Sequence, residues 1–576
     1  MDHLDHHRGP ATGTPARGAA RPRRARATAV RALAAVVVAL LGGSLLAGCD
    51  AATRTTATGA APEAQVPGAP TSSPSPSLSQ APPAQPPPRL AERQVRTAVG
   101  QLDGLVGGLM RRTGVPGVAV SVVHRGEVIH QKGYGVRRVG EPDKVDADTV
   151  FALASLSKPL ASTVVAGVVG RDEKVAWDDP VVEHDPGFAL RDPWVSERVT
   201  IEDLFAHRSG LPDHAGDLLE DLGYDQAYIL RHLREQPLAP FRATYAYTNM
   251  GLTAAAVAVA RARGTTWEAL SSDVLYKPLG MDSTSSRFAD YEKAGNKAAL
   301  HVPGARGVWR AEHTRDADAQ SPAGGASSTV RDMGEWMKLQ LADGEAGGRR
   351  VVDAEALNRT RLPHSLSRPA RAPAGRSGFY GLGWNVDYDD EGRLKLSHSG
   401  AFNLGAATAV ALLPSEGLGI VVLTNGRPIG VPETVTSAFL DIAQHGRQTV
   451  DWWTLANEAF QSLDAAERSD TDYTKPPSDA APPKPASVYE GTYANPYYGP
   501  LTVRAGADGR LVMELGPRPT RFRLFPYDGD TFSYESTGEN AAGRFGVTFT
   551  TASGAQASKV VVENLDRTGL GTFTRG

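Results

Sequence analysis

Hydrophobic and polar positions along the chain predict two folded regions with different periodicities. Apolar residues recur at helical spacing from Leu90, and this pattern ends on Gly114. Two β-branched runs then flank His124-Arg125-Gly126-Glu127, which predicts a hairpin. Helical spacing dominates to about residue 345, including 200–206, 228–233 and 252–262. After residue 380 strand-like runs return, in RLKLSHSG, ATAVALLP and LGIVVLTN.

Strands at both ends of this first region, residues 90–467, enclose a helical middle. We therefore expect an α+β domain in which the terminal segments share one antiparallel sheet flanked by helices, with a helical subdomain inserted between them.

The C-terminal residues 486–576 have a different pattern. Short strand-like runs such as LTVRA, RLVMEL and GVTFTT are separated by turn signals every 8–12 residues, which predicts a small all-β barrel or sandwich. The proline-rich segment 468–485 before it is predicted to be a linker. Because the C-terminal region has no nucleophile or metal-ligand motif, we expect it to be accessory.

The N-terminal residues 1–49 have the order of an export signal: arginine-rich, then apolar, then small residues. They end on Leu46-Ala47-Gly48-Cys49, which resembles a bacterial lipobox, so Cys49 is the expected lipidation site. The Pro/Ser/Ala-rich residues 50–89 are predicted to be a disordered tether. These features predict an extracytoplasmic protein, lipid-anchored to the cell membrane. Whether export is by Sec or Tat is left open.

The amino-acid composition indicates how many cores, and which partners, disulfides and cofactors, can be expected. The 576 residues are 41% hydrophobic, which is ample for two cores. A net charge of -3, from 61 basic and 64 acidic residues, gives no reason to expect a nucleic-acid partner. The single cysteine excludes an intramolecular disulfide. We see no metal-ligand pattern and expect no cofactor.

FALASLSKPLAS, residues 151–162, contains the one Ser-x-x-Lys match of the chain, Ser155 and Lys158. About two matches are expected by chance in a chain of this length, so context has to decide. A serine needs a neighbouring base to become a nucleophile, and residues i and i+3 share a helix face. Ser157 and Ser162 are predicted to be structural.

Two further triplets follow in order: Tyr247-Thr248-Asn249, and His398-Ser399-Gly400 at the end of a predicted strand. Each triplet is common. Other matches lie in the wrong setting: Tyr493-Ala494-Asn495, His7-Arg8-Gly9, His124-Arg125-Gly126 and His214-Ala215-Gly216.

With its three ordered motifs, the chain resembles the serine β-lactamase and penicillin-binding superfamily, in the branch of class C β-lactamases, DD-peptidases and esterases. Further stretches typical of that branch are VTIEDLFAHRSGLP, YKPLGMDST, SPAGGASSTVRDMGEWM and YGLGW. The segment YEGTYANPYYGPLTVRAGADGRLVMEL is similar to the lipocalin-like β domain often appended to such hydrolases.

The resemblance implies that Ser155 is the acylated nucleophile and that Lys158 and Tyr247 transfer its proton. Which of the two is the formal base stays open. It implies substrate binding by Asn249 and His398, with the backbone N–H groups of Ser155 and Ala401 as the oxyanion hole. Gly400 would let the backbone approach the substrate closely.

The third motif of class C β-lactamases normally begins with lysine, whereas here it begins with His398. This favours a DD-peptidase-like or esterase-like hydrolase acting on a peptide, amide or ester, with the peptidoglycan stem peptide among the candidate substrates. The alternatives are a β-lactamase and a non-catalytic receptor for β-lactams or peptidoglycan.

Overall fold

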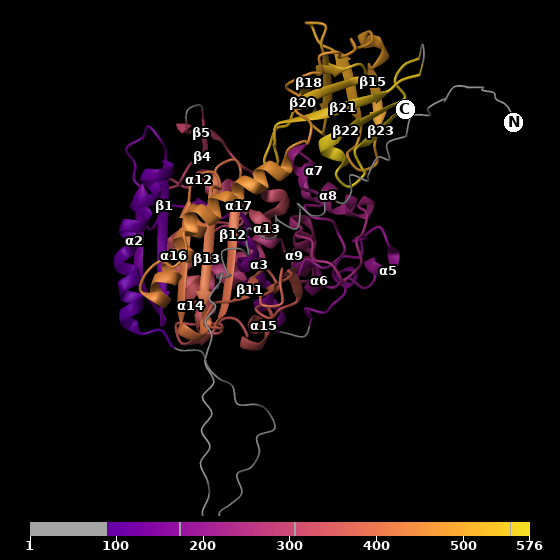
Figure 1. Ribbon diagram of the computed structural model, residues 1–576. Coiled ribbons are helices and arrows are strands. Elements are labelled where there is room, and N and C mark those ends of the chain that lie inside the picture. The colour runs from indigo at the N-terminus through magenta and orange to yellow at the C-terminus, as the bar shows by residue number, and fades with distance from the viewer. Residues whose placement is uncertain (1–88, 172–173, 305–306, 553–554) are drawn as a thin grey trace, which may run out of the picture.

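The computed structural model describes residues 89–576, except 172–173, 305–306 and 553–554 (Figure 1). The predicted signal peptide, Cys49 and the tether up to residue 88 lie outside the described residues. In the part of the chain that is described, no helix is long and apolar enough to cross a membrane.

An eight-stranded antiparallel sheet forms the centre of the first region. The strands that begin and end this region in sequence are adjacent, since Val118 pairs with Thr424. The predicted α+β arrangement is therefore confirmed. In spatial order the strands are β2 (Glu127–Gly135), β1 (Gly117–His124), β14 (Leu418–Thr424), β13 (Ala406–Leu413), β12 (Leu394–Phe402), β11 (Asn385–Tyr388), β10 (Gly378–Tyr380) and β9 (Ser365–Arg368).

Helices cover both faces of this sheet, which explains the near-continuous apolar runs of its central strands. Every residue of β1, β13 and β14 is buried. On one face α2 (Glu92–Thr113) and α16 (Val431–His445) lie side by side, and α17 (Trp452–Glu467) packs on α16 (Figure 1). On the other face α14 (Val330–Leu341) contacts β1 and β14.

The remaining helices form the inserted subdomain beside the sheet. α3 (Ser157–Val169) and α9 (Asn249–Ala262) are almost entirely buried, and α9 begins three residues before its predicted start. The shorter helices are α4 (Val181–His184), α5 (Pro193–Ser196), α6 (Ile201–Phe205), α7 (Asp217–Asp221), α8 (Gln226–His232), α10 (Trp267–Ser271), α11 (Lys277–Leu279), α12 (Phe288–Lys293), α13 (Ser321–Gly324) and α15 (Ala354–Arg359).

The C-terminal region is a nine-stranded antiparallel sheet that curls into a nearly closed barrel, as predicted. Alternating burial along β17 shows that side chains from one face of the sheet fill its interior. In spatial order its strands are β18 (Thr520–Arg523), β17 (Leu511–Leu515), β16 (Leu501–Ala505), β15 (Gly491–Ala494), β23 (Thr572–Arg575), β22 (Lys559–Val562), β21 (Arg544–Thr550), β20 (Thr531–Glu535) and β19 (Phe525–Asp528).

The barrel lies against the helical subdomain near α7 and α8 (Figure 1). The hydroxyls of Tyr224 and Tyr228 donate to the backbone carbonyls of Tyr498 and Tyr497, at 2.8 and 3.2 Å. One cluster of buried apolar side chains runs from the first region into the barrel. The two regions therefore share a core.

Residues 468–485, predicted as a linker, lie along the barrel. Ser469 donates to Glu563 at 2.7 Å, and the rings of Tyr473 and Tyr527 are 4.8 Å apart. Further along, the Ala481 N–H donates to Asp528 at 2.9 Å. The segment is polar in sequence because it stays at the surface, but these contacts fix its path.

Candidate active site

Ser155 lies in a sharp turn between a short strand and the first buried helix of the subdomain. β3 (Phe151–Ala152) pairs with β6 (Ser327–Ser328), a 3-10 turn spans Ala154–Leu156, and α3 follows directly. Ala154 has a φ of 49°, a left-handed conformation that non-glycine residues rarely adopt. Such strain is typical of functional turns and presents the Ser155 side chain to the cavity.

Lys158 is fully buried one turn after Ser155, and all its hydrogen-bond partners are uncharged. Its Nζ lies 3.0 Å from Ser155 Oγ, 2.7 Å from Asn249 Oδ1 and 3.0 Å from the Ala323 carbonyl. Burial lowers the pKa of this amine to about 7. The spacing predicted from sequence thus places an amine of neutral pKa on the serine.

The second motif approaches the same point from the start of α9. The Tyr247 phenol is a hydrogen-bond partner of Ser155, and its ring lies under Lys158 Nζ, 4.5 Å from the ring centre. Burial raises the pKa of Tyr247 well above its usual value, so the phenol is neutral at pH 7. Asn249 is oriented by Asp217, whose Oδ2 accepts from its Nδ2 at 2.8 Å.

His398 lies on β12 with both ring nitrogens occupied. Nδ1 lies 2.7 Å from the Ser399 carbonyl, which can only accept, so Nδ1 carries the proton. Nε2 is therefore free to accept from the Tyr380 hydroxyl at 2.9 Å. Burial, assisted by the charge of Lys158, lowers the pKa of His398 to about 3. The imidazole is uncharged at neutral pH.

Gly400 packs directly on the nucleophile turn. A Cβ at this position would lie 2.2 Å from the Leu153 carbonyl and 3.0 Å from Ser155 N. Only glycine allows β12 to approach this closely. As a result Ala401, the next residue, lines the same cavity as Ser155.

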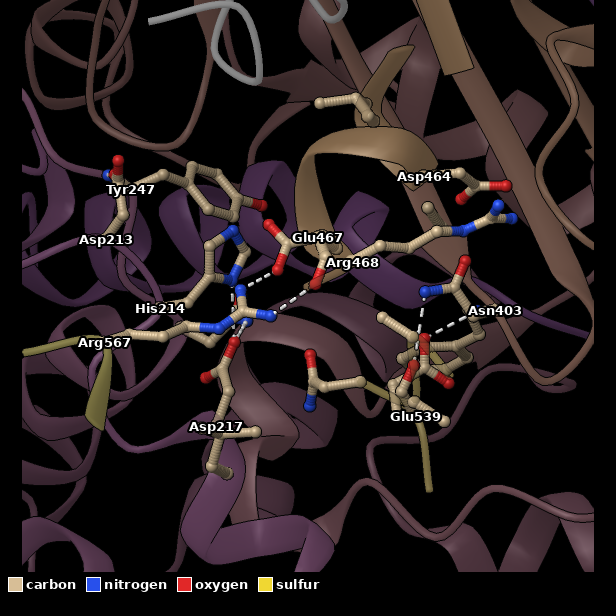
Figure 2. Close-up of a pocket in the computed structure, with 18 of the residues that line it drawn as sticks. Asp213, His214, Asp217, Tyr247, Asn403, Asp464, Glu467, Arg468, Glu539 and Arg567 are labelled. Carbon is tan, nitrogen blue, oxygen red and sulfur yellow. Dashed lines mark hydrogen bonds and ion pairs between the residues drawn. The ribbon is translucent and has the colours of Figure 1, made fainter. Parts of the chain in front are cut away.

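A cavity of about 880 Å³ contains the predicted site, and side chains of both folded regions line it (Figure 2). The predicted residues that line it are Ser155, Tyr247, Asn249, His398 and Ala401. Lys158 and Gly400 lie behind this surface, in contact with Ser155. The barrel contributes Tyr497, Glu539 and Arg567, among others, and the segment 468–474 contributes further lining residues.

Several charged groups of this cavity were not found by sequence reasoning. His214, set aside above as a chance motif match, lies in the cavity with its Nδ1 2.8 Å from Asp217 Oδ2. Arg315 forms a buried ion pair with Glu220 at 2.6 Å. Glu539 bonds to the turn after β12 (Figure 2). His214 matched the His-x-Gly spacing but was set aside by its position, whereas Arg315 and Glu539 belong to no recognisable spacing and have no local signal in the sequence.

Two family models match the chain. Residues 102–444 match the Beta-lactamase family, and residues 475–569 match a domain of unknown function, DUF3471. The second match begins inside the segment that was predicted as a linker.

Named relatives and a solved structure were also found. The chain is 27% identical over 417 residues to Unguisins hydrolase ungD' of Aspergillus campestris, covering 68% of this chain and 74% of that protein. It is 23% identical over 356 residues to Protein flp of Staphylococcus aureus, covering 60% and 67%. The octameric penicillin-binding protein homologue from Pyrococcus abyssi has a similar fold, with a TM-score of 0.52 at 18% identity, covering 81% of this chain and 98% of that one.

Proposed function

The chain belongs to the beta-lactamase family and is a serine hydrolase of that type, and we propose that it hydrolyses a peptide, amide or ester through an acyl-enzyme on Ser155. The observation that carries the proposal is the 3.0 Å contact between Lys158 Nζ and Ser155 Oγ, at a serine that lines a large cavity.

We assign the general base to Lys158. A neutral lysine amine has two N–H donors and one lone pair. Asn249 Oδ1 and the Ala323 carbonyl take the two donors, so the lone pair faces Ser155 Oγ. The pKa of about 7 makes the free amine abundant at neutral pH. Tyr247, whose phenol stays protonated, serves better as a proton relay.

The reaction then proceeds in two halves. Lys158 takes the Ser155 proton while Oγ bonds to the substrate carbonyl carbon, and the N–H groups of Ser155 and Ala401 stabilise the oxyanion. The bond to the leaving group breaks, and the leaving group receives the proton through Lys158 and Tyr247. Water attacks the acyl-enzyme in the same way and releases the acid, which regenerates Ser155.

The third motif favours peptide, amide or ester substrates over β-lactams. A β-lactam antibiotic carries a carboxylate that a permanent cation at this position helps to bind. His398 offers no charge at neutral pH, and both its nitrogens already have partners. One relative is named as a hydrolase of unguisins, which supports hydrolysis as the reaction. A peptidoglycan stem peptide is one candidate, but its terminal carboxylate meets the same uncharged imidazole, so the argument from His398 favours substrates that carry no carboxylate next to the scissile bond.

The proposal includes extracytoplasmic anchoring through Cys49, supported by the lipobox-like sequence and the Pro-rich residues that follow. Fatty-acid labelling of the expressed protein should be lost in Cys49→Ser. Labelling that persists in this variant would contradict the anchor.

Intact-mass profiling tests the enzymatic proposal. Wild-type protein and Ser155→Ala would each be exposed to p-nitrophenyl acetate, a D-Ala-D-Ala peptide and nitrocefin. We expect an acyl mass increment and turnover with ester or peptide in the wild type alone. Acylation of Ser155→Ala would overturn the nucleophile, and rapid turnover of nitrocefin alone would favour a β-lactamase.

A further inference from the structure

The loop between β20 and β21, residues 536–543, contacts two parts of the first region that support the active-site cavity: helix α7 and the turn after β12. Residues 539–543 of this loop line the cavity. The barrel sequence matches a domain of unknown function, and these contacts suggest what it contributes in this protein.

The loop is anchored to the helical subdomain at Asp221, the last residue of α7. The carboxylate accepts from the backbone N–H groups of Glu539 and Asn540, both at 2.9 Å, and from Asn540 Nδ2 at 2.8 Å. Gly538, with a φ of 97°, allows this approach, because a Cβ there would lie 2.6 Å from Asp221 Oδ1. The backbone of the loop is thereby fixed.

The Glu539 side chain points from this anchored loop to the turn between β12 and β13 (Figure 2). Its carboxyl group accepts from the backbone N–H of Asn403 at 2.6 Å and of Leu404 at 3.4 Å. Asn403 Nδ2 also donates to the Glu539 carbonyl at 3.2 Å. The Glu539 side chain is only 11% exposed, so little water is available to replace it as an acceptor.

Arg315 holds the same turn from another direction. Its guanidinium lies 5.3 Å from the centre of the Phe402 ring, and its Nε is 3.9 Å from Glu539 Oε2. Glu220, next to Asp221 on α7, binds the other end of the guanidinium at 2.6 Å. Residues 402–404 are therefore held by the barrel and by α7 together.

These contacts end one residue from the proposed oxyanion hole. Ala401 directly precedes Phe402 on β12, and its N–H must point at the reacting oxygen to within a few tenths of an ångström. We propose that Glu539 is a positioning residue: by binding the N–H groups of Asn403 and Leu404 it fixes Ala401, and the barrel is thereby part of the active site. This inference rests on the function proposed above.

Through Asp221 the same loop also contacts α7, the helix that supports the general base. Asp217, one turn before Asp221, orients Asn249, which in turn accepts from Lys158. A single barrel loop thus contacts the helix that supports the base and the turn that supports the oxyanion donor. This helix and this turn come from segments of the chain more than 150 residues apart.

The test compares full-length Glu539→Ala, Glu539→Gln and Asn540→Ala with the wild type. Its readout is phosphonylation of Ser155 by a fluorophosphonate probe, resolved into the maximal rate and the half-saturating concentration. We expect Glu539→Ala to lower the maximal rate by about 10- to 100-fold, with half-saturation changed less than about twofold. Glu539→Gln keeps one acceptor and should show a smaller loss.

Asn540→Ala is the matched control. It removes a side-chain bond to Asp221 from the same loop but leaves the backbone anchors and the Asn403 contact. It should lower the melting temperature about as much as Glu539→Ala but cause a clearly smaller loss of phosphonylation rate, because the backbone N–H groups of Glu539 and Asn540 still bind Asp221. Ser155→Ala, run in parallel, should not react.

Three outcomes would overturn the inference. Equal rates for Glu539→Ala and the wild type would reduce Glu539 to a structural contact. Equal rate losses in Asn540→Ala and Glu539→Ala would point to general loosening of the interface. A changed half-saturation with an unchanged maximal rate would make Glu539 a binding residue. Reaction of Ser155→Ala would instead overturn the proposed function, and the inference with it.

Discussion

Lys158 and Arg315 are buried cations next to the same cavity, and their different neighbours shift their pKa values in opposite directions. Lys158 has three uncharged hydrogen-bond partners, and burial lowers its pKa to about 7. Arg315 lies between the carboxyl groups of Glu220 and Glu539. Burial alone would lower its pKa, but the two acids outweigh that effect and raise it. One group can therefore exchange a proton, and the other is permanently charged.

The two cations also have different roles, because Lys158 takes part in the proposed reaction and Arg315 supports the structure around the site. Lys158 contacts the nucleophile, and its partners leave its lone pair available. Arg315 contacts the supports of the site, namely α7, Phe402 and the barrel loop. Burial raises the pKa of Glu220 to about 7 and that of Glu539 to about 8. The two carboxyl groups share the single Arg315 guanidinium, which offsets only part of this effect for each. We expect substitution of Lys158 to lower activity and substitution of Arg315 to lower the free energy of unfolding.

Lys158→Arg should have the largest effect on activity. Arginine keeps the charge but cannot release its proton near neutral pH, so the base is lost. We expect phosphonylation and ester turnover to fall by about 10²- to 10⁴-fold. The control is Lys395→Arg, a second buried lysine, on β12, that faces Asp387. Activity in Lys158→Arg within about tenfold of the wild type would remove Lys158 as the base.

Arg315→Met should act mainly on stability. Without the guanidinium, Glu220 and Glu539 lose their ion-pair partner and stay buried only by taking up protons; breaking a buried pair in this way costs about 3–5 kcal/mol in the free energy of unfolding. Urea denaturation at neutral pH would measure it. The control is Arg310→Met, whose pair with Glu312 is exposed (52% and 53%) and should contribute less than about 1 kcal/mol. Equal destabilisation by the two variants would mean that Arg315 does not anchor the interface.

The pH dependence of activity should follow Lys158, because it is the titrating group that contacts the nucleophile. Glu220 and Glu539, with pKa values raised to about 7 and about 8, support the site without contacting the nucleophile and are expected to change the rate less. The unprotonated amine is the base, so turnover of an uncharged ester should rise about tenfold per unit up to pH 7 and level off above it. His398, with a pKa lowered to about 3, and Arg315, with a raised pKa, should add no inflection in this range. A flat profile between about pH 5.5 and 8.5 would contradict the assignment of the base.

Much of the fold could be predicted because its signals are local. The hairpin around His124-Arg125-Gly126-Glu127 follows from two β-branched runs and a turn, and the structure has it as β1 and β2. The proximity of Ser155 and Lys158 also follows from local geometry, since residues three apart share one side of a helical turn. The resemblance of the ordered motifs to a known family supplied the rest of the predicted site.

The barrel's place in the cavity could not be predicted in this way. Residues 468–485 look like a linker because proline, serine and aspartate suit both a free chain and a fixed surface path. Glu539 bonds to backbone N–H groups 135 and 136 residues away, and such groups are present at almost every position whatever the side chain. The region was expected to be accessory because it has no motif, but a positioning contact needs none.

The sequence by itself determined the α+β architecture, the all-β C-terminal region and the Ser155–Lys158 pair, because periodicity and short motifs are properties of neighbouring residues. The order of its motifs, through their resemblance to a known family, added Tyr247, Asn249 and His398 as candidates. Only the tertiary structure decided that Lys158 has a pKa near 7, that His398 is uncharged and that Glu539 reaches the turn after Ala401. Charge states and long-range contacts depend on which groups are buried together, and burial is set by the whole fold.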